Sequence, residues 1–241
     1  MLSSSVFADV VIDGFKMPES VAQDKDGNIY VSEIGERDVD KDGKITMIDK
    51  SGKRITIVDD LYDPKGLVLF GNKLHAGTMQ FPRSPVFLND IDVDDKGNLY
   101  VSDSGDFKST GQIFVIKTTG EIETIFEDER NLIKAPNGLL LDGETLFILD
   151  WAGEFFQADL NKKSFKKIAD GFNGGDGIAK VKETFFLSSW LEGKLYKLID
   201  GKAELVSDKF EAAADISLSQ DNKKVYVPDM KAGTLTILDL N

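Results

Sequence analysis

Apolar and polar residues alternate along short runs of this chain, and the runs recur in a fixed order. Each unit opens on a polar residue, continues through an aliphatic stretch and a polar turn, and reaches a β-rich run such as IYVS or LYVS. Clear copies begin at Pro18, Leu88, Pro136, Gly175 and Ala214. Alternation of period two predicts strands, and self-similarity at a period of about 40 residues indicates a propeller or an array.

The intervals between the polar residues that open each unit, here called openers, give the number of units. The last three openers are separated by intervals of 39 residues, and the first clear interval, between Glu19 and Asn89, spans 70 residues and has room for two units. We place the missing opener at Lys65, just before the run LVLF. The six openers are then Glu19, Lys65, Asn89, Asn137, Asp176 and Asp215.

Within one unit the pattern predicts four antiparallel strands. In the third unit these are residues 91–93, 99–102, 112–117 and 121–126, with glycine-containing turns in the first and last hairpins. Four-stranded units repeated radially form the blades of a propeller. We therefore expect one domain over residues 1–241, an all-β, six-bladed β-propeller of four-stranded antiparallel blades.

Two units depart from the pattern. The sixth has only three strands, while residues 7–12 form a spare strand, so we expect the N-terminal strand to close the last blade and cover its exposed edge. The second unit has only 24 residues between Lys65 and Asn89, and two clear strands. Either this blade is natively short, or about 20 residues have been lost relative to a full repeat.

The opener of each innermost strand is expected at one mouth of the central tunnel, so the six openers predict a ring. Its carboxylates and amide carbonyls, on Glu19, Asn89, Asn137 and Asp176, offer oxygen ligands only. Such a set suits Ca²⁺ first, with Mg²⁺, Mn²⁺ or Zn²⁺ as alternatives. The competing interpretation is that these residues bind backbone or water at strand starts. Lys65 is either the counter-charge of the ring or, as we favour, a solvent-facing residue.

Charge and composition restrict the partners. A net charge of −13 repels phosphate backbones, so we expect no nucleic acid partner. The absence of cysteine excludes disulfides and thiolate metal sites, and the single His75 argues against a histidine zinc site or a Ser-His-Asp centre. No apolar run approaches the ~20 residues that cross a bilayer, so we expect no membrane partner. Oligomeric state cannot be inferred from this composition.

The opening motifs resemble the gluconolactonase, senescence marker protein and luciferin-regenerating enzyme family. They are PESV, LNDI, PNGL and GDGI, beginning at Pro18, Leu88, Pro136 and Gly175. The resemblance implies a six-bladed propeller whose tunnel holds one divalent metal, usually calcium, and activity on lactones; the related paraoxonases and diisopropylfluorophosphatase have a similar arrangement. The implied ligands are Glu19, Asn89, Asn137 and Asp176.

The resemblance also implies a mechanism and a small-molecule substrate. The metal polarises the lactone carbonyl and activates a water, Asp176 or Asp215 takes the proton, and Asn89 and Asn137 orient the carbonyl oxygen. One departure is Phe87, which stands where sugar-lactone members often carry arginine. A sugar-acid substrate is therefore disfavoured, and loss of catalysis is an open alternative.

Several residues outside the ring are candidates for binding. Second-strand ends, including Asp103, and the nearby Trp151 and Trp190 predict a pocket rim with an apolar wall, with packing between blades as the alternative. Arg83 is a loop cation that can meet an anionic substrate or offset the acidic surface. A second, peripheral Ca²⁺ site is suggested by calcium-loop spacing, with a solvated acidic loop as the alternative; its residues are Asp38, Asp40 and Asp42.

Three functions remain open from the sequence. The first is a metal-dependent lactonase or esterase acting in the tunnel. The second is a non-enzymatic binding propeller, because NHL-type repeats share the GN[IL]YV[ST] run. The third is a catalytically silent protein that keeps the metal for stability. The chain is expected to be soluble, and its localisation stays open between the cytoplasm and export to the periplasm or medium after loss of a signal peptide.

Overall fold

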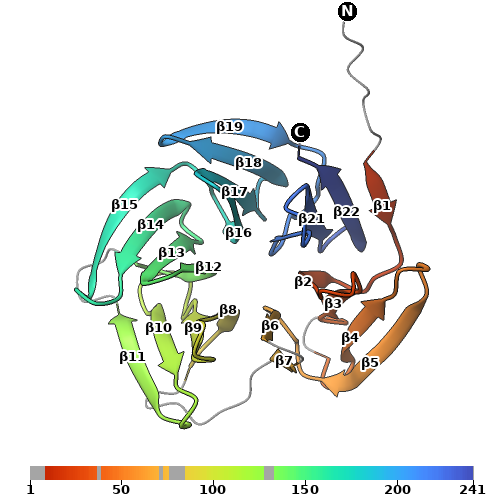
Figure 1. Cartoon of the computed structure of the whole chain (residues 1–241), viewed down its shortest axis with the longest axis horizontal. Coiled ribbons are helices and arrows are strands. Elements are labelled where there is room, and N and C mark those ends of the chain that lie inside the picture. The colour runs from red at the N-terminus through yellow and green to blue at the C-terminus, as the bar shows by residue number, and fades with distance from the viewer. Residues whose placement is uncertain (1–8, 37–38, 71–72, 76–84, 128–132, 241) are drawn as a thin grey trace, which may run out of the picture.

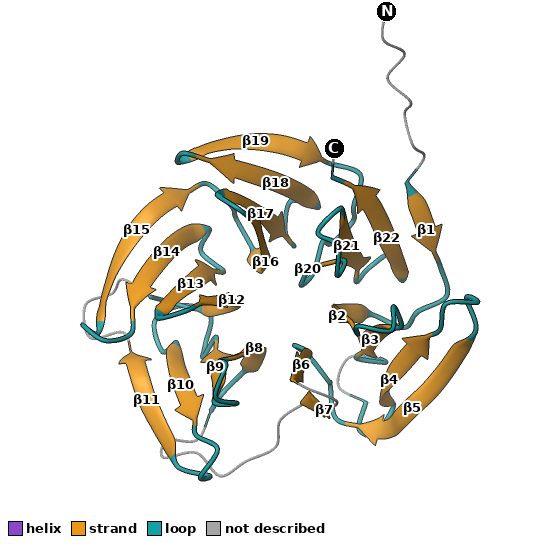
Figure 2. Ribbon diagram, viewed as in Figure 1, coloured by secondary structure: helices purple, strands orange, loops and turns teal. Residues whose placement is uncertain are grey.

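The computed structural model describes residues 9–36, 39–70, 73–75, 85–127 and 133–240. These residues form five four-stranded antiparallel sheets and one two-stranded sheet, arranged radially around a central axis (Figure 1). Strands and loops account for all of these described residues (Figure 2). Among the described residues no helix is long and apolar enough to cross a membrane.

The sheets follow one another in chain order. The first blade is β2 (Pro18–Gln23), β3 (Ile29–Glu33), β4 (Gly43–Ile48) and β5 (Arg54–Leu61), and the two-stranded sheet is β6 (Val68–Phe70) and β7 (Lys73–His75). Next come β8 (Leu88–Val93), β9 (Leu99–Asp103), β10 (Gln112–Ile116) and β11 (Ile122–Glu127). Then follow β12 (Pro136–Asp142), β13 (Thr145–Asp150), β14 (Glu154–Asp159) and β15 (Ser164–Asp170).

The last two sheets complete the ring. One is β16 (Gly175–Val181), β17 (Thr184–Ser189), β18 (Lys194–Ile199) and β19 (Lys202–Ser207). The other joins β20 (Ser217–Leu218), β21 (Lys224–Asp229) and β22 (Thr234–Asp239) to β1 (Val10–Ile12), in the order β1-β22-β21-β20. Val10 pairs with Ile237 and Ile12 with Leu235. The expected closure of the last blade by the N-terminal strand is confirmed.

Burial falls from the axis outward. Inner and middle strands such as β2 and β10 are almost wholly buried, whereas the outer strand β5 is exposed along nearly its full length. The apolar clusters lie between adjacent blades: one joins Ile113 and Phe126 to Leu139 and Ile148 across two neighbouring sheets. Burial on both faces explains why the middle strands read as continuous apolar runs, such as LFIL in β13.

The polar turns close the first hairpins as expected. Asp24 accepts hydrogen bonds from the backbone and side-chain nitrogens of Asn28, and Asp94 does the same for Asn98. Gly27 and Gly97 take positive φ values of 83° and 87° in these turns, which glycine adopts without steric cost. The acidic residues of these two loops thus shape hairpins.

Candidate functional site

Four inner strands carry the same irregularity at the same place. In β2, β8, β12 and β16 the pairing with the second strand skips at the opener, so that two residues of the inner strand face one residue of its partner. Such a bulge bends the strand and re-aims a side chain. The first bulged residues are Glu19, Asn89, Asn137 and Asp176.

In three of the bulges, a serine hydroxyl hydrogen-bonds the backbone N–H that loses its partner in the strand pairing. Ser32 Oγ accepts the backbone N–H of Ser20 at 2.9 Å, and Ser188 Oγ accepts that of Gly177 at 2.7 Å. Ser102 Oγ accepts the backbone N–H of Asp90 at 2.9 Å and donates to the Asn137 carbonyl at 2.7 Å. The serines of the IYVS, LYVS and FLSS runs therefore fix the openers, because a buried N–H without a partner is costly.

Close contact between inner strands narrows the ring. A Cβ on Gly138 would lie 1.9 Å from the backbone oxygen of Asp176, and a Cβ on Gly177 would lie 2.3 Å from the nitrogen of Ile216. Real Cβ atoms cannot approach so closely, so only glycine lets these strands meet. This proximity brings donors from different blades together.

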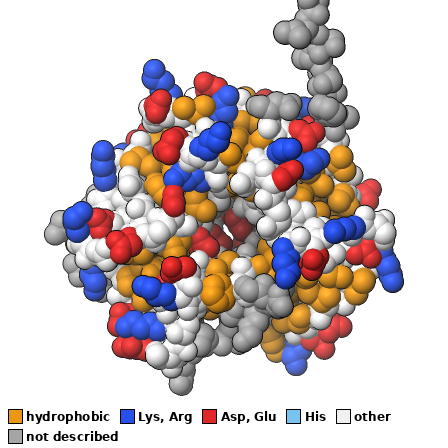
Figure 3. All heavy atoms as spheres, in the orientation of Figure 1, with side chains coloured by type: hydrophobic (Ala, Val, Ile, Leu, Met, Phe, Trp, Pro, Cys, Tyr) orange, Lys and Arg blue, Asp and Glu red, His pale blue; other side chains and the backbone are white. Residues whose placement is uncertain are grey.

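The four openers line one cavity of about 360 Å³. Acidic side chains are visible at the centre of the molecule when it is viewed along its axis (Figure 3). The other lining residues are Ile34, Asp63, Lys65, Phe87, Phe107, Trp151, Trp190 and Met230. Ile34 and Asp63 were not among the residues expected from the sequence; Ile34 directly follows β3, as Trp151 and Trp190 follow β13 and β17.

Of the three acids that line the cavity, Glu19 and Asp176 are buried and Asp63 is exposed. Glu19 is 3% exposed and Asp176 is 4% exposed. Burial raises the pKa of Glu19 to about 8, with Lys65 opposing the rise and Asp215 adding to it. Burial, followed by the charges of Glu19 and Asp215, raises the pKa of Asp176 well above its ordinary value. Among the described residues, Glu19 Oε2 and Asp176 Oδ1 have no hydrogen-bond partner.

Lys65 faces this cavity, so the interpretation of it as a solvent-facing residue is wrong. Its ammonium lies 4.4 Å from the centre of the Phe87 ring, a cation–π distance, and its charge lowers the pKa of Glu19 and of Asp176. The aromatic face and the carboxylates together hold the side chain inward. Its register with the other openers was the signal in the sequence.

The two asparagines donate hydrogen bonds to neighbouring groups, and the Asn137 side chain also lowers the pKa of Asp176 through a hydrogen bond. Asn89 Nδ2 donates to Ser104 Oγ and Asn137 Nδ2 to the Gly175 carbonyl, both at 3.1 Å. Both residues line the cavity, and each has one amide oxygen, Oδ1, that can accept or ligate there. Two carboxylates and two amide oxygens form an all-oxygen donor set of the type that hard divalent cations take.

The unpartnered carboxylate oxygens of Glu19 and Asp176 fit such a cation. A positive charge there would offset the cost of burying both acids. Among the described residues no three Asp, Glu or His side chains converge as a metal cluster; the present set instead combines two acids with two amides. The residues therefore fit a divalent ion, and Lys65 supplies one further positive charge on the same wall.

Asp215 is buried but is not among the residues that line the cavity. Its Oδ2 accepts a 2.6 Å hydrogen bond from Ser20 Oγ, and its backbone N–H donates to the Glu19 carbonyl at 3.0 Å. Burial raises the pKa of Asp215 to about 7 against the lowering effect of the Ser20 hydrogen bond. Of the two acids expected to act as base, only Asp176 therefore lies on the cavity wall.

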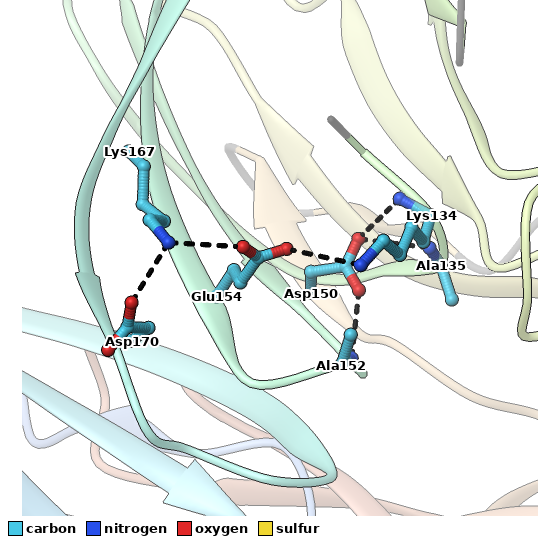
Figure 4. Close-up of polar contacts among 7 residues, drawn as sticks. All are labelled: Lys134, Ala135, Asp150, Ala152, Glu154, Lys167 and Asp170. Carbon is cyan, nitrogen blue, oxygen red and sulfur yellow. Dashed lines mark hydrogen bonds and ion pairs between the residues drawn. The ribbon is translucent and has the colours of Figure 1, made fainter. Parts of the chain in front are cut away.

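The acids at the second-strand ends turn away from the cavity. Asp150 accepts the backbone N–H groups of Lys134, Ala135 and Ala152 at 2.8–2.9 Å (Figure 4). Glu154 at its side pairs with Lys134 and Lys167. Both acids thereby anchor the segment that leads into the blade of β12–β15.

Asp103 has the same structural role, which corrects its expected part in substrate binding. It is fully buried, and its carboxylate accepts hydrogen bonds from the backbone of Phe87 and Gly105 and from Gln112 Nε2. Its oxygens are therefore committed to the protein.

Other expected residues lie outside this cavity or outside the described residues. Arg83 and Asp38 are not among the described residues. Asp40 is exposed, and Asp42 Oδ2 accepts the backbone N–H of Glu36 at 2.7 Å. The peripheral calcium site stays a prediction.

Aromatic rings line part of the same cavity. The ring centres of Phe87 and Phe107 are 4.8 Å apart, those of Phe107 and Trp151 are 5.4 Å apart, and those of Trp151 and Trp190 are 5.7 Å apart. Lys231 lies 4.2 Å from the Trp190 ring centre. These four aromatic residues, called the aromatic arc below, provide the expected apolar wall.

Solved structures of known proteins share the fold of this chain. No family model matches the sequence, and no curated protein is significantly similar to it. A gluconolactonase from Xanthomonas campestris is 12% identical with a TM-score of 0.74, covering 95% of this chain and 88% of that one. A luciferin-regenerating enzyme is 13% identical with a TM-score of 0.72, covering 97% and 96%.

A calcium-binding protein, regucalcin from Agrobacterium tumefaciens, is 16% identical with a TM-score of 0.73 and covers 93% of this chain and 90% of that one. Identities of this size establish similarity of fold and leave activity to be argued from the site. The chain therefore has the propeller fold of gluconolactonase, regucalcin and luciferin-regenerating enzyme.

Proposed function

We propose that this protein is a divalent-cation-dependent hydrolase that acts on a lactone or related ester in the central cavity. The observation that carries the proposal is the pair of buried carboxylate oxygens, on Glu19 and Asp176, that lack hydrogen-bond partners beside two asparagine amide oxygens. The named activities of the structural neighbours, a gluconolactonase and a luciferin-regenerating enzyme, support it.

The proposed ligands are Glu19, Asn89, Asn137 and Asp176, with Ca²⁺ as the first choice and Mg²⁺, Mn²⁺ or Zn²⁺ as alternatives. A divalent cation held there would polarise the ester carbonyl and make a water more acidic. Two formal negative charges would balance it.

The remaining chemistry belongs to the chain. Asp176 is the proposed proton acceptor for the attacking water because, of the two acids expected in that role, it lies on the cavity wall and Asp215 does not. Lys65 would stabilise the oxyanion of the tetrahedral intermediate, because its ammonium shares the wall with the donor set. The aromatic arc excludes water from one side of the reacting group.

We further infer that β6–β7 is a shortened second blade, so that the propeller has six. The segment before β6 joins both neighbouring inner strands: Leu67 N donates to Ser20 Oγ and Gly66 N to the Asn89 carbonyl, each at 3.0 Å. Lys65 thereby takes the ring position of an opener.

A catalytically silent binding propeller is the second candidate. It is favoured by Lys65, whose ammonium already offsets part of the acidic charge in the cavity. Cation titration and turnover assays separate the two candidates.

The test combines calorimetric titration of cation-stripped protein with Ca²⁺ and assays on aromatic, aliphatic and sugar lactones with and without chelator. We expect at least one lactone to be hydrolysed, chelator to abolish turnover and added Ca²⁺ to restore it. Asp176→Asn should lose cation affinity and turnover together, whereas Asp170→Asn, an exposed acid in β15, should lose neither. Calcium binding without any turnover would support the silent protein, and undiminished affinity in Asp176→Asn would remove that residue from the ligands.

A further inference from the structure

The apolar half of the cavity has a regular origin in the fold. Trp151, Trp190 and Met230 each directly follow the second strand of a blade, and Phe107 lies in the turn after β9. The polar openers instead come from the bulges of the inner strands. The cavity therefore has an oxygen-lined floor and, on the side of these four blades, an apolar wall.

The aromatic arc is continuous along that wall. Consecutive ring centres from Phe87 through Phe107 and Trp151 to Trp190 are 4.8, 5.4 and 5.7 Å apart, with interplanar angles of 67°, 70° and 45°. All four side chains are only half-buried, so they leave aromatic surface for a ligand to cover. Burial of such surface favours binding.

Polar partners are scarce along the arc. Among the described residues they lie at its two ends: the Lys65 ammonium is 4.4 Å from the Phe87 ring centre and the Lys231 ammonium 4.2 Å from the Trp190 ring centre. The indole N–H of Trp190 donates to Met230 Sδ at 3.3 Å. A sugar lactone carries hydroxyls around its ring, and each would lose its hydrogen bonds to water against this wall. A flat apolar ring loses none.

Phe107 is held in a conformation that bulky residues rarely adopt. Its φ is +58°, within the left-handed region that favours glycine. The turn is fixed by Asp106, whose Oδ1 accepts the backbone N–H groups of Lys108, Ser109 and Thr110. Backbone outliers of this kind concentrate at ligand sites, and here the outlier places a ring between Phe87 and Trp151.

From this wall we propose that the ligand is a flat aromatic lactone or aryl ester, with its carbonyl on the oxygen-lined floor and its ring against the aromatic arc. The assignment rests on the proposed function for the reaction and on the arc for the substrate class. A cavity of about 360 Å³ lies near the lower end of the range for ligand pockets, which suits one or two fused rings.

Binding can be measured independently of hydrolysis. The chain has two tryptophans, and both belong to the arc, so intrinsic fluorescence reports on this wall alone. The probes are two lactams that resist hydrolysis, 3,4-dihydroquinolin-2-one and glucono-δ-lactam, each titrated with Ca²⁺ and with chelator. We expect the aromatic lactam to bind at least tenfold more tightly. Equal or tighter binding of the sugar lactam would overturn the proposal.

Variants locate the effect. Phe107→Leu should weaken binding of the aromatic lactam about tenfold and leave binding of the sugar lactam unchanged. Leu205→Ala, at an exposed outer-strand position, should change neither affinity. With Ca²⁺-loaded protein, 3,4-dihydrocoumarin should have a higher kcat/KM than glucono-1,5-lactone, and Phe107→Leu should raise its KM with little change in kcat.

The two proposals fail separately. Hydrolysis of glucono-1,5-lactone faster than dihydrocoumarin would overturn the substrate class and leave the hydrolase in place. Tight aromatic lactam binding without turnover of any lactone would overturn the hydrolase and support an aromatic ligand for a binding propeller. Loss of binding of both lactams in Phe107→Leu, together with a lowered melting temperature, would assign that residue to folding and count against the proposal.

Discussion

Replacement of Glu19 by glutamine should make the cation-free protein more stable. Glutamine keeps the shape of the side chain and cannot ionise, so it avoids the cost of a buried carboxyl whose pKa is raised from 4.5 to about 8. The folded state holds the Glu19 proton more tightly than the unfolded state. Wild-type stability therefore falls as pH rises from about 4.5 to about 8, and below 4.5 the contribution vanishes because both states are protonated.

The magnitude at pH 7 follows from the distance to the ordinary pKa. At pH 7 the pH lies about 2.5 units above the ordinary pKa of 4.5, and each unit is worth about 1.36 kcal/mol. The buried carboxyl therefore lowers the free energy of unfolding of the cation-free protein by about 3 kcal/mol. For a chain of this size, removing this cost corresponds to a rise of about 6–12 °C in melting temperature. Ca²⁺ should instead stabilise wild type more than the variant. At a Ca²⁺ concentration of about 100 times Kd, the free energy of unfolding of wild type should rise by about 2.7 kcal/mol, and that of the variant by much less.

Thermal unfolding from pH 4.5 to 8, with chelator and with Ca²⁺, measures both effects. The matched control is Glu183→Gln, at an exposed position in the β16–β17 turn, which should follow wild type throughout. A Glu19→Gln protein less stable than wild type in chelator at pH 7 would refute the reasoning. A stability gap of the same size at pH 4.5 and pH 7 would refute it equally, because the titration of Glu19, together with its effect on the pKa of Asp176, makes the gap depend on pH.

Two further predictions concern the frame around the cavity. Gly138→Ala should lower the free energy of unfolding by about 3 kcal/mol and weaken Ca²⁺ binding, because its Cβ would displace the Asp176 backbone. Denaturant titration measures the stability and calorimetry measures the Ca²⁺ affinity. A variant with unchanged stability and affinity would contradict the close contact. Asp150→Ala should cost about 3 kcal/mol, since it leaves three backbone N–H groups without their acceptor. Exposed Asp170→Ala is its control, and equal stability of the two variants would contradict the anchoring role.

The blade repeat was readable from the sequence because each strand alternates in step with its neighbours. The period-two runs, the turn at Asp94–Asn98 and the spare N-terminal strand all have local signals, and the structure confirms them. The bulges at the openers have no such signal. A bulge is defined by the partner strand, and the serine that fills it lies 11 to 13 residues away.

Side-chain direction was the part that sequence could not settle. Asp103 and Asp150 end second strands shortly before residues that line the cavity, yet their carboxylates accept nearby backbone N–H groups and do not line it. Lys65 was misjudged in the opposite direction, because its partners Phe87 and Glu19 are distant in sequence. Register thus predicted which residues lie near the cavity, whereas contacts with residues distant in sequence determine which side chains face it.

The pairing of β1 with β22 governs when the site can first exist. A ribosome makes Ile237 about 225 residues after its partner Val10, which takes roughly 10 to 45 seconds at ordinary rates of translation. The blades between them can fold on the nascent chain from local hairpins. Glu19 can settle beside Asp215 only after the circle closes, so cation binding should report on finished molecules and be absent from every shorter intermediate.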